Sequence, residues 1–582
     1  MGRLDDLKAA SSRSDFAKLL HYTPKGLAFV LYKTPIAANY CQFTVPKAGG
    51  GVRTIDAPEK ALKLLQSRMG DLLSDCLDEI EKSNPNRMKV SHGFHRGRSI
   101  VTNAIPHRRK RYVLNLDITD FFGAINFGRV RGFFIKDKNF LLNPAVATVI
   151  AQIACYNNKL PQGSPCSPVI ANLIARILDV RLARLAKDHG CVYTRYADDI
   201  TFSTDRRTFP HKIAKRRFWS KRKWRLMKAL TNEFENSGFL INPKKTRMQI
   251  RGSRQETTGL IVNEKINVSQ DYYRDVRAMA HSLFSTGAYH LPNSPRTEDG
   301  TAEPANSFAP LEGRLAHIYY VKFRRDRDEQ EKKNSGFIPP RAPKELYKRY
   351  LFYKHCVSST EPVIVSEGKT DVIYLKCAIR AMHPQYAHLS KVVNGAMKYS
   401  VRFLRPSYVN NSVFELGSSA SQMAGFISSY RNRLRRYRHC PMSAPVILIA
   451  DNDDGIGKVL KNANKLIPTP INIATTQCWF HLTHNLYLIK TPHVAARAKS
   501  CMEDLFSAQL KAVRIDGKPF DPKKEHGDET AYGKAIFAER VVRTQAQPAD
   551  FAGFAPLLQA IDAAVADYHS RLAAKAAVAT GP

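Results

Sequence analysis

The alternation of apolar and polar residues predicts strands that end in acidic residues in the first half of the chain. Residues 111–125 (RYVLNLDITDFFGAI) begin as an apolar strand and end in an acidic turn. Residues 190–204 (GCVYTRYADDITFST) form two β-rich arms around Ala197-Asp198-Asp199, which predicts a hairpin with the acidic pair at its tip. Between them, the pattern of residues 143–187 is typical of a helix, a Pro- and Gly-rich loop, and a second, long helix.

A different pattern begins after residue 360. PVIVSEGKTDVIYLKCAI (362–379) and PVILIADNDDGIGKVLKNA (445–463) each consist of an apolar strand, an acidic residue and a helix. This repetition predicts a separate α/β domain with a parallel sheet. GFIPPRAP (336–343) is typical of a linker, residues 291–310 of an inserted loop, and the Ala-rich segment 554–577 of an amphipathic helix.

Composition adds a strong charge to this picture. The 582 residues include 90 Lys or Arg against 51 Asp or Glu, a formal net charge of +39. Such a surface favours a polyanionic partner, with nucleic acid the leading candidate and an anionic membrane surface the alternative. The densest basic segment is 206–228, which holds eleven Lys or Arg, no acid, and Phe218, Trp219 and Trp224. We expect it to form an RNA-binding helix.

The same composition argues against other classes of protein. We find no run of about 18 apolar residues, so we expect no membrane span. The N-terminus has no apolar core typical of a signal peptide. The ten Cys are scattered without a CxxC pair. They indicate reduced thiols in a cytoplasm rather than a disulfide scaffold or a zinc ribbon.

Three carboxylates are the first candidate site. Asp117 ends an apolar strand, and Asp198 and Asp199 stand together at a hairpin tip. Adjacent anions repel, so this pair does not stabilise a turn by itself. Carboxylates from separate segments are suitable ligands for two Mg²⁺ ions, which can activate a hydroxyl and stabilise a leaving pyrophosphate. An ordinary solvated turn is the alternative.

Six segments in order resemble the reverse transcriptase family. LNLDITDFF (114–122), LPQGSPCSPVIANL (160–173), YADD (196–199) and GFLINPKKTR (238–247) are similar to its motifs A, B, C and D. Two further segments, RTIDAPEKALKLLQ (53–66) and HGFHRGRSI (92–100), are similar to its fingers motifs. Beyond these six, LEGRLAHIYYV (311–321) is similar to its thumb. The resemblance implies an α+β right-hand polymerase with fingers, palm and thumb.

The resemblance also implies roles for single residues. Asp117, Asp198 and Asp199 would hold two Mg²⁺ ions. Phe122 would exclude a 2′-hydroxyl and so select deoxynucleotides (dNTPs). Lys245, or its neighbour Lys244, would act on the pyrophosphate. The remaining dNTP-binding candidates are Gln162, Gly163 with Ser164 beside it, Arg53 and Arg96.

Two further segments resemble retron reverse transcriptases. NAIPH (103–107) matches their Asn-Ala-x-x-His element, and TTGLIVN (257–263) is similar to their Val-Thr-Gly element, with Thr257 in place of Val. These enzymes copy an adjacent structured noncoding RNA into a branched RNA–DNA called msDNA. The resemblance implies that this RNA contacts Asn103, His107, Thr258, Gly259, Arg216, Arg217, Lys221, Arg222 and Lys223.

The segment 361–490 resembles the Toprim domain of topoisomerases, primases and OLD-type nucleases. Glu367 and the Asp451-x-Asp453 pair follow the predicted strands and carry the match. One or two Mg²⁺ ions at Glu367, Asp451 and Asp453 would then support a nuclease, used as an effector in antiphage defence. Acids that cap the following helices are the alternative.

The predicted domains are 1–110 (N-terminal region and fingers), 111–265 (palm), 266–340 (thumb with the loop 291–310), 361–490 (Toprim-like) and 491–582 (helical extension). A group II-like or other prokaryotic reverse transcriptase with an unrelated C-terminal domain is one alternative. A catalytically degenerate nucleic-acid-binding regulator is another. Self-association is compatible with either.

Overall fold

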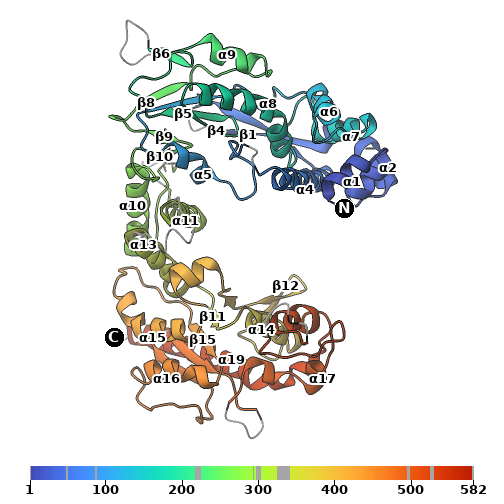
Figure 1. The fold of residues 1–582 in the computed structure, drawn as a ribbon. Coiled ribbons are helices and arrows are strands. Elements are labelled where there is room, and N and C mark those ends of the chain that lie inside the picture. The colour runs from blue at the N-terminus through green and yellow to red at the C-terminus, as the bar shows by residue number, and fades with distance from the viewer. Residues whose placement is uncertain are drawn as a thin grey trace. The chain divides into compact units, whose positions relative to one another are not determined.

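The computed structural model describes residues 2–33, 35–46, 50–85, 88–216, 224–292, 294–295, 303–323, 341–417, 419–494, 499–524, 528 and 530–579 (Figure 1). The predicted linker up to residue 340, parts of the predicted loop 291–310 and the basic residues 217–223 lie outside them. The chain divides into two compact units: residues 1–270 with 321–338, and residues 271–320 with 339–582.

The first unit is built around a four-stranded antiparallel sheet with the order β4-β5-β3-β8. The predicted apolar strand and acidic hairpin are both present in it. Its strands are β3 (Tyr112–Asp117), β4 (Val192–Tyr196), β5 (Asp199–Thr204) and β8 (Arg247–Ile250). Three two-stranded hairpins accompany it: β1 (Tyr40–Pro46) with β2 (Val52–Pro58), β6 (Ala214–Arg216) with β7 (Trp224–Leu226), and β9 (Glu256–Thr257) with β10 (Leu260–Ile261).

The helices of this unit pack around one apolar core. The long predicted helix is α8, and Ile170, Ile174, Leu178 and Leu182 repeat every four residues along its buried face. The helices in chain order are α1 (Arg3–Ala9), α2 (Arg13–Leu19), α3 (Pro24–Ala28), α4 (Lys60–Ser83), α5 (Ile100–Ala104), α6 (Phe127–Lys136), α7 (Pro144–Ala154), α8 (Ser167–Asp188) and α9 (Lys228–Glu235). Short turns η1 (Phe29–Lys33), η2 (Ile36–Asn39) and η3 (Ile105–His107) complete it.

The basic segment 206–228 corrects one prediction. Its described part forms the antiparallel arms of the β6-β7 hairpin rather than a helix. Trp224 packs edge-on against Tyr112 and Phe209, with ring centroids 6.1 and 5.8 Å away. Aromatic packing onto the palm therefore fixes an extended conformation here, and Trp224 belongs to the core rather than to a base-stacking surface.

The second unit contains the predicted parallel sheet. Its order is β14-β11-β15-β17-β16, in which β16 alone runs antiparallel to its neighbour. The strands are β11 (Val363–Ser366), β14 (Arg402–Phe403), β15 (Val446–Ala450), β16 (Trp479–Thr483) and β17 (Leu486–Lys490), and β12 (Ser390–Val393) pairs with β13 (Ala396–Tyr399). The longer helices are α10 (Gln270–Thr286), α11 (Ala309–Phe323), α13 (Arg341–Phe352), α14 (Lys369–Ala381), α15 (Ala420–Leu434), α16 (Gly457–Ala463) and α19 (Ala555–Ala579).

Short helical turns fill the rest of this unit: η4 (Tyr353–Val357), η5 (Asn410–Phe414), η6 (Asp454–Ile456), η7 (Met502–Leu505), α17 (Ala508–Lys511), α18 (Lys534–Ile536), η8 (Phe537–Val542) and η9 (Pro548–Phe554). Helices α10 and α11, which the sequence assigns to a thumb, belong to this compact unit together with α13.

The C-terminal helix corrects the expectation that no apolar stretch reaches the length of a membrane span. Among the residues that the structure describes, one helical stretch, Pro548–Val578, has that length and composition. However, Leu557, Leu558, Ile561 and Val565 on it are fully buried in the apolar core beneath α14 and the sheet. This burial favours a core helix over a membrane span.

Candidate active sites

The acidic hairpin brings Asp198 and Asp199 against Asp117. Strands β3 and β5 pair so that Asp117 and Asp199 lie directly opposite each other, and the Ile118 amide donates to the Asp198 carbonyl at 3.0 Å. The turn between β4 and β5 passes through Ala197, whose φ is +56°. The sheet register therefore brings Asp117 next to the Asp198-Asp199 pair, which lies about 80 positions later in the sequence.

Burial and neighbouring charges perturb the two acids of the hairpin, Asp198 and Asp199. Burial and the charges of Asp198 and Asp117 raise the pKa of Asp199 to about 6. Burial, followed by Asp117, raises the pKa of Asp198 as well, while the charges of Lys245 and Arg53 oppose the shift. The site formed by Asp117, Asp198 and Asp199 therefore carries a surplus of negative charge.

Lys245 already supplies one cation to this charge. Its Nζ donates to Asp117 Oδ1 at 2.7 Å, and Asn242 Nδ2 donates to Asp117 Oδ2 at 3.1 Å. The hydrogen bond to Asp117 raises the pKa of Lys245, which keeps the side chain protonated. Lys244 and Lys245 both line the cavity that opens beside the carboxylates, but it is Lys245 that contacts the Asp117 carboxylate.

The carboxylates suit a hard divalent ion. No group of three or more acidic, His or Cys side chains within the described residues is close enough to hold a metal as it stands. Nevertheless, nearby negative charge helps to raise the pKa values of both Asp198 and Asp199, a charge imbalance that a bound Mg²⁺ would relieve, and oxygen ligands are the ones that this ion prefers. The donor set at Asp117, Asp198 and Asp199 therefore fits this ion.

A cavity of about 430 Å³ opens beside the carboxylates. Asp117, Asp199 and Lys245 line it together with Thr258 and Gly259. The latter two form the tight turn between β9 and β10, with φ of +47° and +76°. The structure thus brings the predicted Val-Thr-Gly-like element to the predicted polymerase centre.

The loop before α8 packs closely against the fingers hairpin. The Asp56 amide donates to the Gln162 carbonyl at 2.9 Å. Gly163 has a φ of +131°, and a Cβ there would lie 2.6 Å from the Asp56 carbonyl oxygen, so only glycine fits. Ser164 is buried, with its hydroxyl 3.2 Å from Cys166 Sγ.

The other predicted nucleotide-binding residues separate into two groups. Phe122 is half-buried and packs on Phe121, with ring centroids 5.4 Å apart. Arg53 is exposed on β2, and its charge reaches Asp198. Arg96 instead forms ion pairs with Asp75 and Asp78 on α4, at 2.5 and 3.0 Å. It does not line the cavity beside the carboxylates.

Two predicted RNA-binding residues lie in the interior instead of on a surface. His107 is fully buried, and Ser203 Oγ and Thr194 Oγ1 each lie 2.7 Å from its ring nitrogens. Burial lowers its pKa to about 3, so the ring is neutral. Asn103 is 1% exposed, and its Nδ2 lies 3.4 Å from Thr258 Oγ1. This burial corrects the prediction that Asn103 and His107 contact RNA directly. The two side chains instead support the palm and the Thr258 turn.

The basic candidates are only partly described. Arg216 is exposed at the end of β6. Arg217, Lys221, Arg222 and Lys223 lie outside the described residues.

A second group of carboxylates lies at the carboxyl end of the parallel sheet. Glu367 follows β11 and Asp451 follows β15, and these neighbouring strands run parallel. Burial, Asp453 and Asp371 raise the pKa of Glu367 to about 7. Burial, Asp371 and Glu503 raise the pKa of Asp451 to about 8. Asp453 caps the short helix η6 by accepting from the Gly455 amide at 2.7 Å.

Three residues of this second group were missed by the sequence reasoning. Asp371 is buried in the first turn of α14. Glu503 is 2% exposed, its Oε1 has no hydrogen-bond partner among the described residues, and its Oε2 accepts from Lys534 Nζ at 3.0 Å. The spacing EGKTD could have indicated Asp371, because an acid three residues after a helix N-cap is typical of a capping box, and the Asp371 carboxylate accepts from the Gly368 amide at 2.7 Å. Glu503 and Lys534 reach the group only through tertiary contacts.

Comparison with known proteins identifies the first unit's class. Residues 45–268 match the family model described as reverse transcriptase (RNA-dependent DNA polymerase). The chain is 35% identical over 299 residues to the retron Mx65 reverse transcriptase of Myxococcus xanthus, covering 48% of this chain and 61% of that protein. It is 33% identical over 281 residues to the retron Ec86 reverse transcriptase of Escherichia coli, covering 48% of this chain and 80% of that protein. The chain belongs to the family of retron reverse transcriptases.

A solved structure also matches at lower similarity. Telomerase from Candida albicans, solved with a fragment of telomeric RNA, is 11% identical, with a TM-score of 0.31 over 55% of this chain and 57% of that one.

Proposed function

We propose that this chain is the RNA-directed DNA polymerase of a retron. The observation that carries this proposal is the register that sets Asp117 opposite Asp199, with Asp198 and Lys245 beside them. In-line attack of a primer hydroxyl on a deoxynucleotide requires acidic ligands and a nearby cation in this arrangement. Mg²⁺, when bound by the three carboxylates, would supply the Lewis acid.

The protein's own side chains would do the remaining work. Lys245, held protonated beside Asp117, is in place to neutralise or protonate the leaving pyrophosphate. The Phe122 ring would exclude a ribose 2′-hydroxyl. Gln162 and Gly163 would bring backbone close to the nascent base pair, and Arg53, whose charge reaches Asp198, would add charge for the triphosphate.

The proposed template and primer are an adjacent structured noncoding RNA, and the product is a branched msDNA in the bacterial cytoplasm. Membership in the retron family and the net charge of +39 support an RNA partner.

This proposal is tested in bacteria that carry the gene with its native upstream DNA. We expect a short RNase-resistant DNA with a branched RNA stub, absent from an Asp198→Asn/Asp199→Asn variant. Purified protein should extend a primed RNA, and the same variant should lose at least about 100-fold in rate. Failure of the purified wild-type protein to extend any primer would favour a catalytically degenerate regulator instead.

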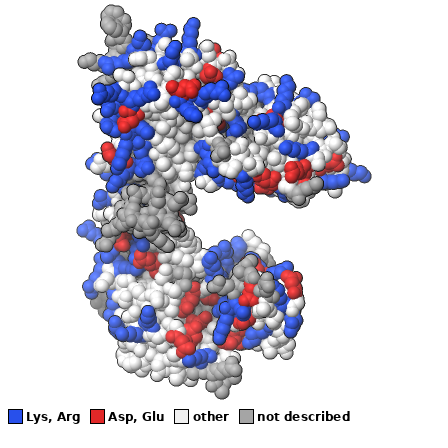
Figure 2. Space-filling model, viewed as in Figure 1, with Lys and Arg blue, Asp and Glu red and all other residues white. Residues whose placement is uncertain are grey.

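We further propose a metal-dependent nuclease of the Toprim type in the second unit, acting as an antiphage effector. The observation in its favour is the convergence of Glu367, Asp371, Asp451 and Glu503 with Lys534 at the end of a parallel sheet. Acidic side chains gather on part of the visible face of this unit in Figure 2. Carboxylates with pKa values as high as about 7 and 8 are typical of functional sites.

The nuclease is tested with purified full-length protein, RNA and DNA substrates, and Mg²⁺ or Mn²⁺. We expect cleavage that Glu367→Ala abolishes and that Asp198→Asn/Asp199→Asn retains. Glu361→Ala, which removes an exposed acid just before β11, is the matched control. Equal cleavage by wild type and Glu367→Ala would refute this second activity.

A further inference from the structure

Arg195 is a fully buried cation inside the palm. It lies near the end of β4 and is 0% exposed. Its Nε and Nη2 donate to the two carboxylate oxygens of Asp179 on α8, each at 2.8 Å. The Tyr193 hydroxyl donates to the same carboxylate at 2.7 Å. Buried ion pairs of this kind contribute little net stability compared with apolar side chains of similar volume, so stability alone does not explain the pair.

The remaining nitrogen of Arg195 reaches the catalytic turn. Its Nη1 donates to the Ala197 carbonyl at 3.0 Å and to Asn172 Oδ1 at 3.1 Å. Ala197 has a φ of +56°, in the left-handed region that a residue with a side chain rarely adopts. Asp198 and Asp199 follow directly. A charged donor on the Ala197 carbonyl therefore holds a strained peptide immediately before the two acids.

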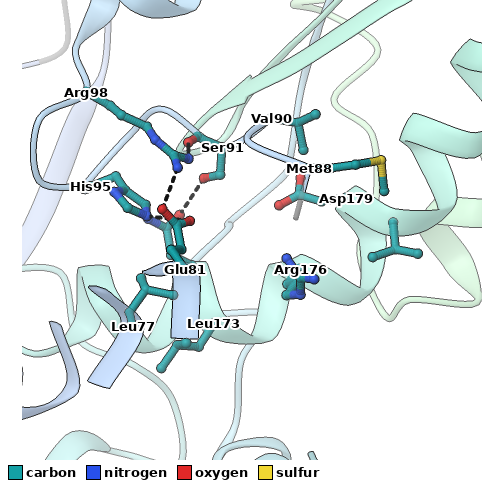
Figure 3. A pocket seen from close by; sticks show the side chains of 12 residues that line it. Leu77, Glu81, Met88, Val90, Ser91, His95, Arg98, Leu173, Arg176 and Asp179 are labelled. Atoms are coloured by element: carbon teal, nitrogen blue, oxygen red, sulfur yellow. Dashed lines mark hydrogen bonds and ion pairs between the residues drawn. The ribbon is translucent and has the colours of Figure 1, made fainter. Parts of the chain in front are cut away.

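The same guanidinium ties the turn to the fingers segment. Its Nη2 donates to Ser91 Oγ at 3.1 Å, and the main chains of residues 90–92 and Arg195 exchange hydrogen bonds of 2.9 and 2.8 Å. Figure 3 shows Ser91 and Asp179 on different elements around the adjoining pocket, with Arg98, which pairs with Glu81 and donates to the Ser91 carbonyl, beside Ser91.

Gly93 completes this contact. A Cβ at Gly93 would lie 2.5 Å from the Ala197 amide nitrogen, and Asn172 Nδ2 donates to the Gly93 carbonyl at 2.5 Å. The guanidinium also lies over the Phe121 ring, 5.7 Å from its centroid. One side chain thus contacts the segments that are similar to motifs A, B and C, through Phe121, Asn172 and Ala197.

We propose that Arg195 is a positioning residue of the polymerase centre. It holds the Ala197 turn so that Asp198 and Asp199 face Asp117 across the paired strands, the arrangement from which the three carboxylates would bind metal. It acts through the Ala197 carbonyl and touches neither substrate nor metal. This inference rests on the proposed polymerase function.

Two variants test it in the full chain. Arg195→Lys keeps the charge but cannot supply the fork of donors that spans Asp179, Asn172 and Ala197. Arg195→Met/Asp179→Leu removes the whole ion pair and leaves no lone buried charge, so folding should persist. Arg181→Lys, on an exposed part of α8 where Arg181 pairs with Glu233 at 3.3 Å, is the matched control.

The first measurement is the single-turnover rate constant for adding one deoxynucleotide, which does not depend on the fraction of active protein. Both variants should lose about 10-fold to 100-fold, with the dNTP concentration at half-maximal rate changed less than about threefold. The second measurement is Mn²⁺ affinity by electron paramagnetic resonance, in a Glu367→Ala/Asp451→Ala background that removes the second carboxylate group. It should weaken about tenfold.

These outcomes separate positioning from simple structural support. Folded variants with an unchanged rate constant and unchanged Mn²⁺ affinity would overturn the inference. Loss of folding in both variants would also overturn it, because Arg195 would then be a structural residue. Should the wild-type chain fail to extend primers, the proposed polymerase function fails, while the Mn²⁺ arm still decides whether Arg195 positions the carboxylates.

Discussion

Asp199, which we propose to be a metal ligand of the polymerase site, has a raised pKa in the metal-free protein. Its pKa is raised to about 6 by burial and by Asp198 and Asp117. A carboxyl with a raised pKa in the folded state favours folding at low pH, and this contribution is lost as the pH rises through that pKa. Above pH 6 the metal-free protein therefore holds an unfavourable anion, as functional sites often do.

Replacing this anion should stabilise the metal-free protein. In EDTA at pH 7.5, Asp199→Asn should raise the Tm of the unit that contains it by about 2 °C, and the gain should shrink as the pH falls from 6 towards 4. Mg²⁺ at pH 7.5 should raise the Tm of this unit in the wild type but not in Asp199→Asn, because it binds the ionised site. Differential scanning fluorimetry at pH 7.5 and across the range from pH 6 to 4 measures these shifts in Tm.

The control for this prediction is Asp205→Asn, because Asp205 is an exposed acid just after the same strand and should show little change. A lower Tm for Asp199→Asn than for the wild type in EDTA at pH 7.5 would contradict the electrostatic account.

Elements with a clear apolar period were predictable from the sequence. The strand that ends at Asp117, the hairpin at Asp198-Asp199, and the helices α7 and α8 all lie where local patterns place them. The parallel β11 and β15 were predicted for the same reason, since buried strands appear as short apolar runs followed by acids. Local periodicity was therefore enough to predict the strands and helices that carry both candidate sites.

Elements defined by distant contacts were not predictable in this way. The basic segment 206–228 has no apolar period strong enough to outweigh its charges, and packing of Trp224 on Tyr112 decides for a hairpin. His107 resembles a surface element in sequence, yet two hydroxyls from β4 and β5 satisfy its ring in the interior. Glu503 and Lys534 join the second site from segments with no motif at all.

The net charge of the entire chain predicts how strongly its affinity for RNA depends on salt. Lys and Arg outnumber Asp and Glu by 90 to 51. Figure 2 shows Lys and Arg spread over the visible face of both units. A partner held by many such side chains releases counterions when it binds, so its affinity depends steeply on salt, whereas a dNTP held at one site depends on it weakly.

We therefore expect the dissociation constant for the cognate RNA to rise about 1,000-fold between 50 and 200 mM KCl, as for six or more phosphate contacts. Filter binding across this range gives the slope. Arg216→Gln, at the exposed end of β6, should reduce the slope by about one if this side chain contacts a phosphate, and Arg571→Gln on α19, where Arg571 pairs with Asp567, should leave it unchanged. An affinity that changes less than about threefold over the range would mean that shape and base contacts, rather than the net charge of +39, hold the RNA.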